Sequence, residues 1–272
     1  MESRSLTFTP LRISTLVTTG HLGSVLNIQK IFEQFPQVCL PIGYPDEGFL
    51  KIEYGEKAVG FSSRDVLSKR KVSKNSFFNQ STIVIRKKRE DGSGFKEVNI
   101  KLFANGGFQM TGITSEEYSK DVLVWLIDKF KDFREVSEKP LKVEKFSVQL
   151  LNSDYKVNAL VRRDELHKIL VNQYKLFSTL ETTIYQGINT KYYYNEVSKV
   201  KNGICMCDKI CNGQGDGKTD SSCKRITIAI FQTGSIIITG ARNISQLEEA
   251  YEFINKILKQ HSIETLKPHT IA

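Results

Sequence analysis

Residues 231–240 read Phe-Gln-Thr-Gly-Ser-Ile-Ile-Ile-Thr-Gly, and residues 103–112 read Phe-Ala-Asn-Gly-Gly-Phe-Gln-Met-Thr-Gly. Four positions carry the same residue in both stretches, each pair 128 residues apart, as in 231 − 103. The pairs are Phe103 and Phe231, Gly106 and Gly234, Thr111 and Thr239, and Gly112 and Gly240. A hairpin that merely ends in glycine would not also repeat an aromatic and a threonine at one offset. The pattern therefore favours an internal duplication, which dictates the whole fold.

Each copy is followed by a stretch with helical periodicity. Its apolar residues recur at spacings of three and four, which places them on one stripe of a helix that packs on a sheet. They are Val122, Leu123, Trp125, Leu126 and Phe130 after the first copy, and Ala250, Tyr251, Phe253, Ile254 and Leu258 after the second. We predict helices at residues 115–132 and 245–260, the first capped by Thr114 or Ser115 and the second by Ser245.

The remaining elements recur in the same order in both halves. Strands are predicted from β-branched and aromatic runs, and helices from amphipathic spacing. The first half has a strand at 11–19, a helix at 27–35, an optional hairpin at 48–61, and strands at 78–88, 98–103 and 108–111; the second has a strand at 146–151, a helix at 163–173, and strands at 182–194, 226–231 and 236–239. Each half is predicted to be β-α-β-β-β-β-α, an α+β arrangement with helices on one face of an antiparallel sheet.

Composition shifts divide the chain into two repeats. The first repeat is predicted at residues 1–133, with an insertion at about 37–77 that contains a basic run at 69–74. A charged stretch with a proline at 134–144 is the predicted connector. The second repeat is predicted at 145–272 and contains a polar, glycine-rich and cysteine-rich insertion at 202–224.

Length and charge set the class of protein. The chain has 272 residues, 40% of them apolar, which is ample for a buried core. It contains neither a run of about 20 apolar residues nor a signal-peptide core, so an intracellular setting is expected. Its net charge of +9 suits a polyanion partner, or equally a lysine-rich surface with no partner. The odd number of cysteines argues against a disulfide framework.

The paired hairpin-and-helix units resemble the core of the TATA-binding proteins, and most of all the divergent TATA-binding-protein-like factors of large DNA viruses, which carry insertions. The resemblance covers the later two-thirds of each repeat, is weak over 37–77 and is absent over 202–224. It implies a saddle in which two β-α-β-β-β-β-α repeats form one curved antiparallel sheet, with helices on the convex face. It also implies that the concave face grips the minor groove of DNA.

The resemblance assigns aromatic wedges, which prise base steps apart, to four positions. Phe103 and Phe231 match wedges at the end of the third strand of each repeat. Their partners start the second strand: Phe78, or its neighbour Phe77, in the first repeat, and Tyr185 in the second. Antiparallel pairing puts the start of one strand opposite the end of its neighbour, so the two rings of each pair should meet. The alternative for any one of these aromatics is a buried core residue.

The resemblance also assigns groove-facing positions. Thr111, Thr239 and Val17 match residues that face the central bases, and the family's paired asparagines fall here at Thr15 and Leu150. The valine of the second repeat falls at Asn152. Leucine cannot donate a hydrogen bond to a base edge. Binding and bending can survive these departures, because backbone charge and deformability supply most affinity; a preference for TATA would depend on the base-edge donors that Leu150 lacks.

Four cysteines lie within the second insertion. Cys205, Cys207, Cys211 and Cys223 form C-x-C-x₃-C-x₁₁-C, and four thiolates so close together could close a tetrahedral zinc site. The spacing is not a common knuckle, so a loop with free reduced thiols is the alternative. No cofactor is required otherwise. The four histidines are scattered and no carboxylate pair stands out, so the sequence predicts no catalytic residues and no enzyme.

The sequence thus predicts a non-enzymatic transcription initiation factor that grips and bends DNA at the minor groove. The alternative is an interaction platform on the same fold that no longer binds DNA specifically; a nuclease-associated domain is a third and weaker reading. The resemblance implies AT-rich promoter DNA, a B-type general transcription factor and RNA polymerase as partners, and no membrane. It implies the nucleus, a cytoplasmic viral factory or the virion as the location.

Overall fold

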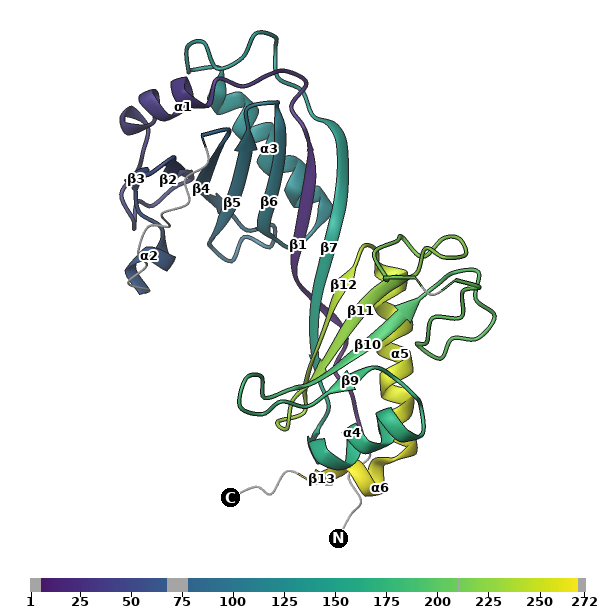
Figure 1. Ribbon diagram of the computed structural model, residues 1–272. Helices are drawn as coiled ribbons and strands as arrows, with labels where there is room; N and C mark the ends of the chain where they lie inside the picture. The colour runs from purple at the N-terminus through teal and green to yellow at the C-terminus, as the bar shows by residue number, and fades with distance from the viewer. Residues whose placement is uncertain (1–5, 68–77, 210, 269–272) are drawn as a thin grey trace. The chain divides into compact units, whose positions relative to one another are not determined.

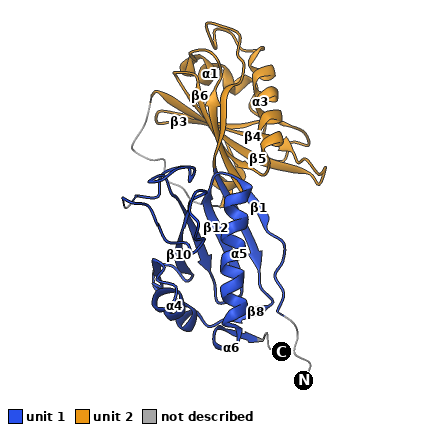
Figure 2. Cartoon of the chain, turned by 90° about the vertical axis from the view of Figure 1, so that its right-hand side faces the viewer, with its two compact units in different colours: residues 1–14, 150–272 blue, residues 15–149 orange. Residues whose placement is uncertain are grey.

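The computed structural model describes residues 6–67, 78–209 and 211–268. The chain divides into two compact units (Figure 2). Unit 2 is residues 15–149, and unit 1 is residues 1–14 together with 150–272. Strands β1 (Arg12–His21) and β7 (Glu144–Lys156) each contribute residues to both units. The first residues of the chain group with the second half because Arg12 of β1 forms an ion pair with Asp154 of β7, at 2.8 Å between Nη2 and Oδ1.

Unit 2 is an antiparallel sheet with helices packed on one side (Figure 1). Its strand order is β3-β2-β4-β5-β6-β1-β7. After β1 come α1 (Ile28–Gln34), the short 3₁₀ helix η1 (Phe35–Gln37), β2 (Gly48–Tyr54), β3 (Lys57–Gly60) and α2 (Ser63–Leu67), then β4 (Gln80–Lys88), β5 (Phe95–Phe103), β6 (Gly107–Ile113) and α3 (Glu116–Phe130). The insertion therefore supplies the hairpin β2–β3 and α2 at the edge of the sheet. The basic run at 69–74 falls outside the described residues.

Unit 1 repeats this plan. Its main sheet has the order β1-β7-β12-β11-β10-β9, and a separate pair joins β13 to β8. After β7 come β8 (Ala159–Val161), α4 (Arg163–Asn172), β9 (Ser178–Thr179), β10 (Ile188–Tyr194), β11 (Lys224–Ile230), β12 (Ser235–Ala241), α5 (Ile244–Gln260), α6 (Ser262–Thr265) and β13 (Leu266–Pro268). The α+β class is confirmed. Each unit has the order β-α-β-β-β-β-α when β2 and β9 are counted as its second strand; β3, α2, β8, α6 and β13 are additions.

The duplication extends to backbone conformation. Gly112 and Gly240 have φ of 86° and 102°, and the tight turns before β6 and β12 use Gly106 and Gly234 at 89° and 81°. The ladder between β1 and β6 shifts register near Gly112, and that between β12 and β7 shifts between Thr239 and Ala241. Glycine tolerates this left-handed backbone, so each Thr-Gly pair places a β-bulge at the same point of its repeat.

Two details of the sequence prediction are wrong. The N-cap of α5 is Asn243, whose side chain accepts from the Gln246 amide, and not Ser245. Asn243 corresponds to Ser115, which caps α3 by accepting from Tyr118 N–H. Residues 182–187 form no strand; only 188–194 pair with β11, because the chain turns after Glu181, whose carbonyl accepts from the amides of Ile184 and Tyr185.

Alternate strand residues divide between a helix-covered face and an open face. In unit 2 Ile83, Ile100 and Met110 are fully buried beneath the helices, while Lys101 and Thr111 on the other face are half-buried. Unit 1 behaves alike, with Ile228 and Ile238 fully buried and Thr227 and Thr239 half-buried. Hydrogen bonds tie the covered faces to their helices, from Thr18 to Ser119 at 2.9 Å and from Tyr155 to Asn255 at 2.7 Å. We call the side of each sheet away from these contacts its open face.

Candidate functional site

Thr239 lies in the middle of the open face of unit 1. It stands opposite Thr227 of β11 on one side and Asn152 of β7 on the other. Its hydroxyl donates to the Asn152 side-chain oxygen. The amide nitrogen of Asn152 has no protein partner among the hydrogen bonds of the described residues, so it is available as a donor on the half-buried open face. Leu150, two residues earlier on β7, is half-buried on the same face.

Thr111 holds the equivalent position in unit 2. It stands opposite Asn99 of β5, and the bulge after it lies beside Val17, between the Leu16 and Thr18 pairings of β1. Thr15, two residues before Val17 on β1, lies on the same face of the strand, and both residues are half-buried. Toward the far end of β1, the side chain of Gln149 donates to the Thr19 hydroxyl at 3.0 Å. The open faces therefore combine hydroxyl and amide groups with short apolar side chains.

The two aromatic residues predicted for unit 1 meet at one edge of its open face. The rings of Tyr185 and Phe231 are 5.5 Å apart between centroids and inclined at 64°. Gly187 permits this contact, because a Cβ there would lie 3.0 Å from the Tyr185 ring and 3.1 Å from the Phe231 ring. Tyr185 remains 40% exposed. Partial burial raises the pKa of its hydroxyl above the ordinary value, so the group is a neutral donor at physiological pH.

Unit 2 departs from the predicted ring pair. Phe103 is half-buried at the end of β5, whereas Phe78 is 66% exposed and packs edge-on against Tyr54, with centroids 5.9 Å apart. The described residues show no ring contact between Phe78 and Phe103, so that expectation is wrong. Gln80 stands opposite Phe103, in the place that Gly187 holds beside Phe231, so a side chain is present there where unit 1 has none. The alternative wedge Phe77 lies outside the described residues.

Basic side chains stand on both open faces without acidic partners. Lys101 lies on β5, Lys191 on β10 and Arg225 on β11. In the described part of the chain, no carboxylate forms an ion pair with any of the three. Burial and the nearby Arg225 charge lower the pKa of Lys191, as expected of a cation that has no counter-ion. Two carboxylates on the open faces already have other partners. Asp154 forms an ion pair with Arg12, and Glu97 accepts a hydrogen bond from the Ser63 amide.

These cations and Asn99 are additions to the predicted site. The sequence signal that locates them is the two-residue alternation of each strand, counted from the repeated threonine: Asn99, Lys101 and Phe103 share one face of β5. The register across the ladder then decides which of them stand beside Thr111. That register, in which Asn99 stands opposite Thr111, is regular along the β5–β6 hairpin and follows from its turn; the bulge lies in the neighbouring β6–β1 ladder.

The four cysteines of the insertion come together. Cys205, Cys207, Cys211 and Cys223 hold their Sγ atoms within 4.8 Å of one another. The loop that carries them joins Tyr194 to Lys224, whereas Tyr185 and Phe231 lie beyond the other end of the β10–β11 ladder. Cys39 is remote in the sequence, is half-buried, and donates to the Leu50 carbonyl at 3.1 Å.

Comparison with known proteins gives three matches. The family model described as transcription factor TFIID (or TATA-binding protein, TBP) matches residues 220–261. A "TATA-box-binding protein-like" protein of Acanthamoeba polyphaga mimivirus is 29% identical over 269 residues, which cover 92% of this chain and 65% of that relative. Among solved structures, Methanococcus jannaschii TBP aligns over 92% of this chain and 97% of its own, with 14% identity and a TM-score of 0.47.

The family model and the mimivirus relative confirm the resemblance to the TATA-binding proteins that the repeat predicts. The matched segment at 220–261 contains β11, β12 and α5, which are the elements that carry the second Thr-Gly copy. This chain spans slightly less than two thirds, 65%, of the length of the mimivirus relative. Within the described residues, no helix is long and apolar enough to span a membrane.

Proposed function

We propose that this protein is a transcription initiation factor of the TATA-binding-protein type, and that the open faces of its two units seat on the minor groove of AT-rich promoter DNA. One observation carries the proposal. Each open face presents a threonine before a bulge-forming glycine, with a phenylalanine at the end of the preceding strand, at the same offset of 128 residues, as in 239 − 111. A sheet face that only packed against solvent would not need the same residues in both repeats.

The chemistry of the open faces suits this groove. The minor groove of an A·T pair displays only the acceptors A N3 and T O2, so hydroxyl and amide donors can bind either orientation of the pair. Thr111 supplies a hydroxyl, and Asn152, whose side-chain oxygen accepts from Thr239, supplies its free amide nitrogen. Short side chains such as Val17 allow the sugar edges to approach. Lys101, Lys191 and Arg225 provide charge for the flanking phosphates, where most affinity arises.

The aromatic residues supply the bending step. An apolar ring inserted between base pairs partly unstacks them and kinks the duplex toward the major groove. Phe231, supported by Tyr185, and Phe103 are the side chains that we assign to this role. Phe78 packs against Tyr54 of the insertion instead of against Phe103, so we do not pair it with Phe103 in this role.

The resemblance extends to partners and location. We propose that the protein acts without catalysis, together with a B-type general transcription factor and RNA polymerase, and that it works where viral genes are transcribed, in the nucleus or a cytoplasmic viral factory, or is packaged in the virion. The exposed side of α3, which includes Val124 at 64% exposure, is a surface for such protein partners.

A second function is favoured by the hydrogen bond between Thr239 and Asn152. That bond occupies the threonine hydroxyl within the protein, and Leu150 cannot donate. The chain would then be an interaction platform in transcription that binds no specific DNA.

A binding titration separates the two functions. Fluorescence anisotropy with labelled AT-rich and GC-rich duplexes should show tighter binding to the AT-rich duplex. The logarithm of the association constant should fall linearly with the logarithm of salt, by about 0.9 for each phosphate contact. Absence of binding to either duplex at low salt would support the platform function.

A further inference from the structure

The four cysteines of the β10–β11 loop are arranged as ligands of a single ion. Their shortest sulfur separations are 3.3 Å from Cys207 to Cys223, 3.5 Å from Cys205 to Cys211 and 3.7 Å from Cys205 to Cys223. Zinc bound tetrahedrally to four thiolates at about 2.3 Å separates its sulfurs by about 3.8 Å. A disulfide requires about 2.05 Å, and all four cysteines are free.

We propose that Cys205, Cys207, Cys211 and Cys223 bind one zinc ion that fixes this loop. Four thiolates form a donor set that selects zinc or an iron–sulfur cluster. Sulfur atoms within 4.8 Å of one another leave room for one ion, whereas a cluster that contains its own sulfides needs its ligands farther apart. With four protein ligands the coordination shell is complete, so the ion is structural and holds no position open for a substrate.

Neighbouring donors suit the negative charge of the thiolates. The Ser221 amide donates to Cys207 Sγ at 3.1 Å. The side-chain amide of Asn195 donates to Cys223 Sγ at 3.5 Å and lies 3.8 Å from Cys207 Sγ. Asn195 is only 6% exposed, so its orientation is fixed by the loop around it. Such outer contacts orient metal ligands and balance their charge.

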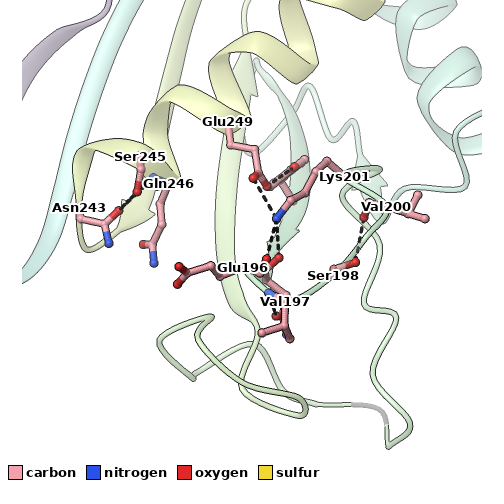
Figure 3. A network of polar contacts seen from close by, with 11 residues as sticks. Glu196, Val197, Ser198, Val200, Lys201, Asn243, Ser245, Gln246 and Glu249 are labelled. Atoms are coloured by element: carbon pink, nitrogen blue, oxygen red, sulfur yellow. Dashed lines mark hydrogen bonds and ion pairs between the residues drawn. The ribbon is translucent and has the colours of Figure 1, made fainter.

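The base of the loop is held against the first turns of α5. Figure 3 shows Lys201 of the loop reaching Glu249 of α5, 3.2 Å from Nζ to Oε2. The Gln246 side chain donates to the Asp216 carbonyl at 2.9 Å, and the Glu196 amide donates to the Gly217 carbonyl at 2.7 Å. These contacts fix the two ends of a polar segment that has few apolar side chains of its own. The ion supplies the cross-link that the tip of the loop lacks.

Metal content is the direct test. The full chain is expressed with zinc in the medium, passed over a sizing column and analysed by plasma mass spectrometry. We expect one zinc per chain, and none in the variant Cys211→Ser with Cys223→Ser. Cys39→Ser is the matched control, because Cys39 lies outside the cluster, and it should keep its zinc. A chain without zinc, or a double variant that retains it, would overturn the proposal.

Cobalt provides a reading that does not depend on variants folding. The unsubstituted chain is stripped with a chelator and titrated with Co²⁺. We expect sulfur-to-cobalt charge-transfer bands and the strong visible absorption of tetrahedral cobalt, saturating at one equivalent and abolished by added zinc. Spectra of octahedral cobalt, or a mass that shows loss of the thiol hydrogens through disulfide formation, would contradict the site. Metal content is measured without DNA, and DNA bending by Phe231, which lies beyond the other end of the β10–β11 ladder, should persist on zinc removal, so the two proposals fail independently.

Discussion

At the scale of single residues, one glycine distinguishes the aromatic pairs of the two repeats. Gly187 lets the Tyr185 ring reach Phe231, whereas Gln80 occupies the matching place beside Phe103. The Phe78 ring instead packs against the ring of Tyr54, which belongs to an insertion that the second repeat lacks. Single residues at matched positions therefore give the repeats different edges, although their strands and bulges agree.

Phe231→Ala should weaken DNA binding without unfolding the chain. Burying a phenylalanine ring contributes about 1.5–3 kcal/mol, so affinity for AT-rich duplex should fall about ten- to a hundred-fold. Anisotropy titration measures this loss. Phe8→Ala is the control, because Phe8 lies beneath Lys259 of α5, away from the open face. An equal loss in both variants would remove Phe231 from the interface.

Asn152→Ala should change sequence preference more than affinity. The variant removes the free amide donor and leaves the phosphate contacts in place, so the preference for AT-rich over GC-rich duplex should fall by about 1 kcal/mol. Competition between the two duplexes for the protein measures the ratio. Thr227→Ala, on the neighbouring strand opposite Thr239, tests whether any polar loss has the same effect. An unchanged ratio for Asn152→Ala would mean that this residue reads no base.

At the scale of elements, the bulges after Thr111 and Thr239 position the candidate site. Each glycine has a backbone conformation that other residues adopt only with strain. A Cβ at Gly112 would lie 2.9 Å from the Glu97 carbonyl oxygen, and one at Gly240 would lie 3.0 Å from that of Arg225. The repeated glycines are thus required by the neighbouring strand as well as by their own φ angles.

Gly240→Ala should lower the free energy of unfolding by about 1–3 kcal/mol, because it adds backbone strain and a close contact. Chemical denaturation measures the change. Gly92→Ala separates the two causes: Gly92 has φ of 70°, but a Cβ added there would meet no atom within 4 Å, so only backbone strain should act. If the two variants were equally stable, contact with the Arg225 carbonyl would contribute nothing.

Local patterns in the sequence predict most of these elements. The fixed offset identifies the two repeats, and apolar spacing identifies α3 and α5 within two residues of their ends. The strand at 182–194 is predicted too long because residues 182–186 are exposed around a turn that period-two spacing does not reveal. The pairing of Phe78 with Tyr54 depends on an insertion whose contacts are not local, and the gathering of four thiols depends on how the loop folds back. Predicting such features requires knowledge of the strand register and of how distant segments pack, which local sequence patterns do not contain.

At the scale of the whole molecule, the effect of the net charge of +9 on DNA binding depends on which cations lack acidic partners. Lys101, Lys191 and Arg225 have no acidic partners among the described residues of the open faces, whereas several lysines on the helices pair within their own turn, such as Lys120 with Glu116 at 2.9 Å. Charge that is already paired contributes little to attraction of a polyanion, so the unpaired cations should dominate the salt dependence of binding.

Lys191→Met should therefore reduce the salt slope of DNA binding by about 0.9, the release expected for one phosphate contact. Lys256→Met, on the exposed side of α5, should leave the slope unchanged. Titrations at several salt concentrations give both slopes. A full slope in Lys191→Met would show that this lysine contacts no phosphate.

Bending of DNA is the sharpest test of whether the paired repeats prise open a duplex with Phe103 and Phe231. A short AT-rich duplex with a donor and an acceptor dye at its ends is titrated with the full chain, and energy transfer is measured. We predict that transfer rises on binding, and that the variant Phe103→Ala with Phe231→Ala still binds at low salt but leaves transfer at the value of free DNA. A bound complex of the unsubstituted chain with no change in transfer would show that these rings do not act as wedges.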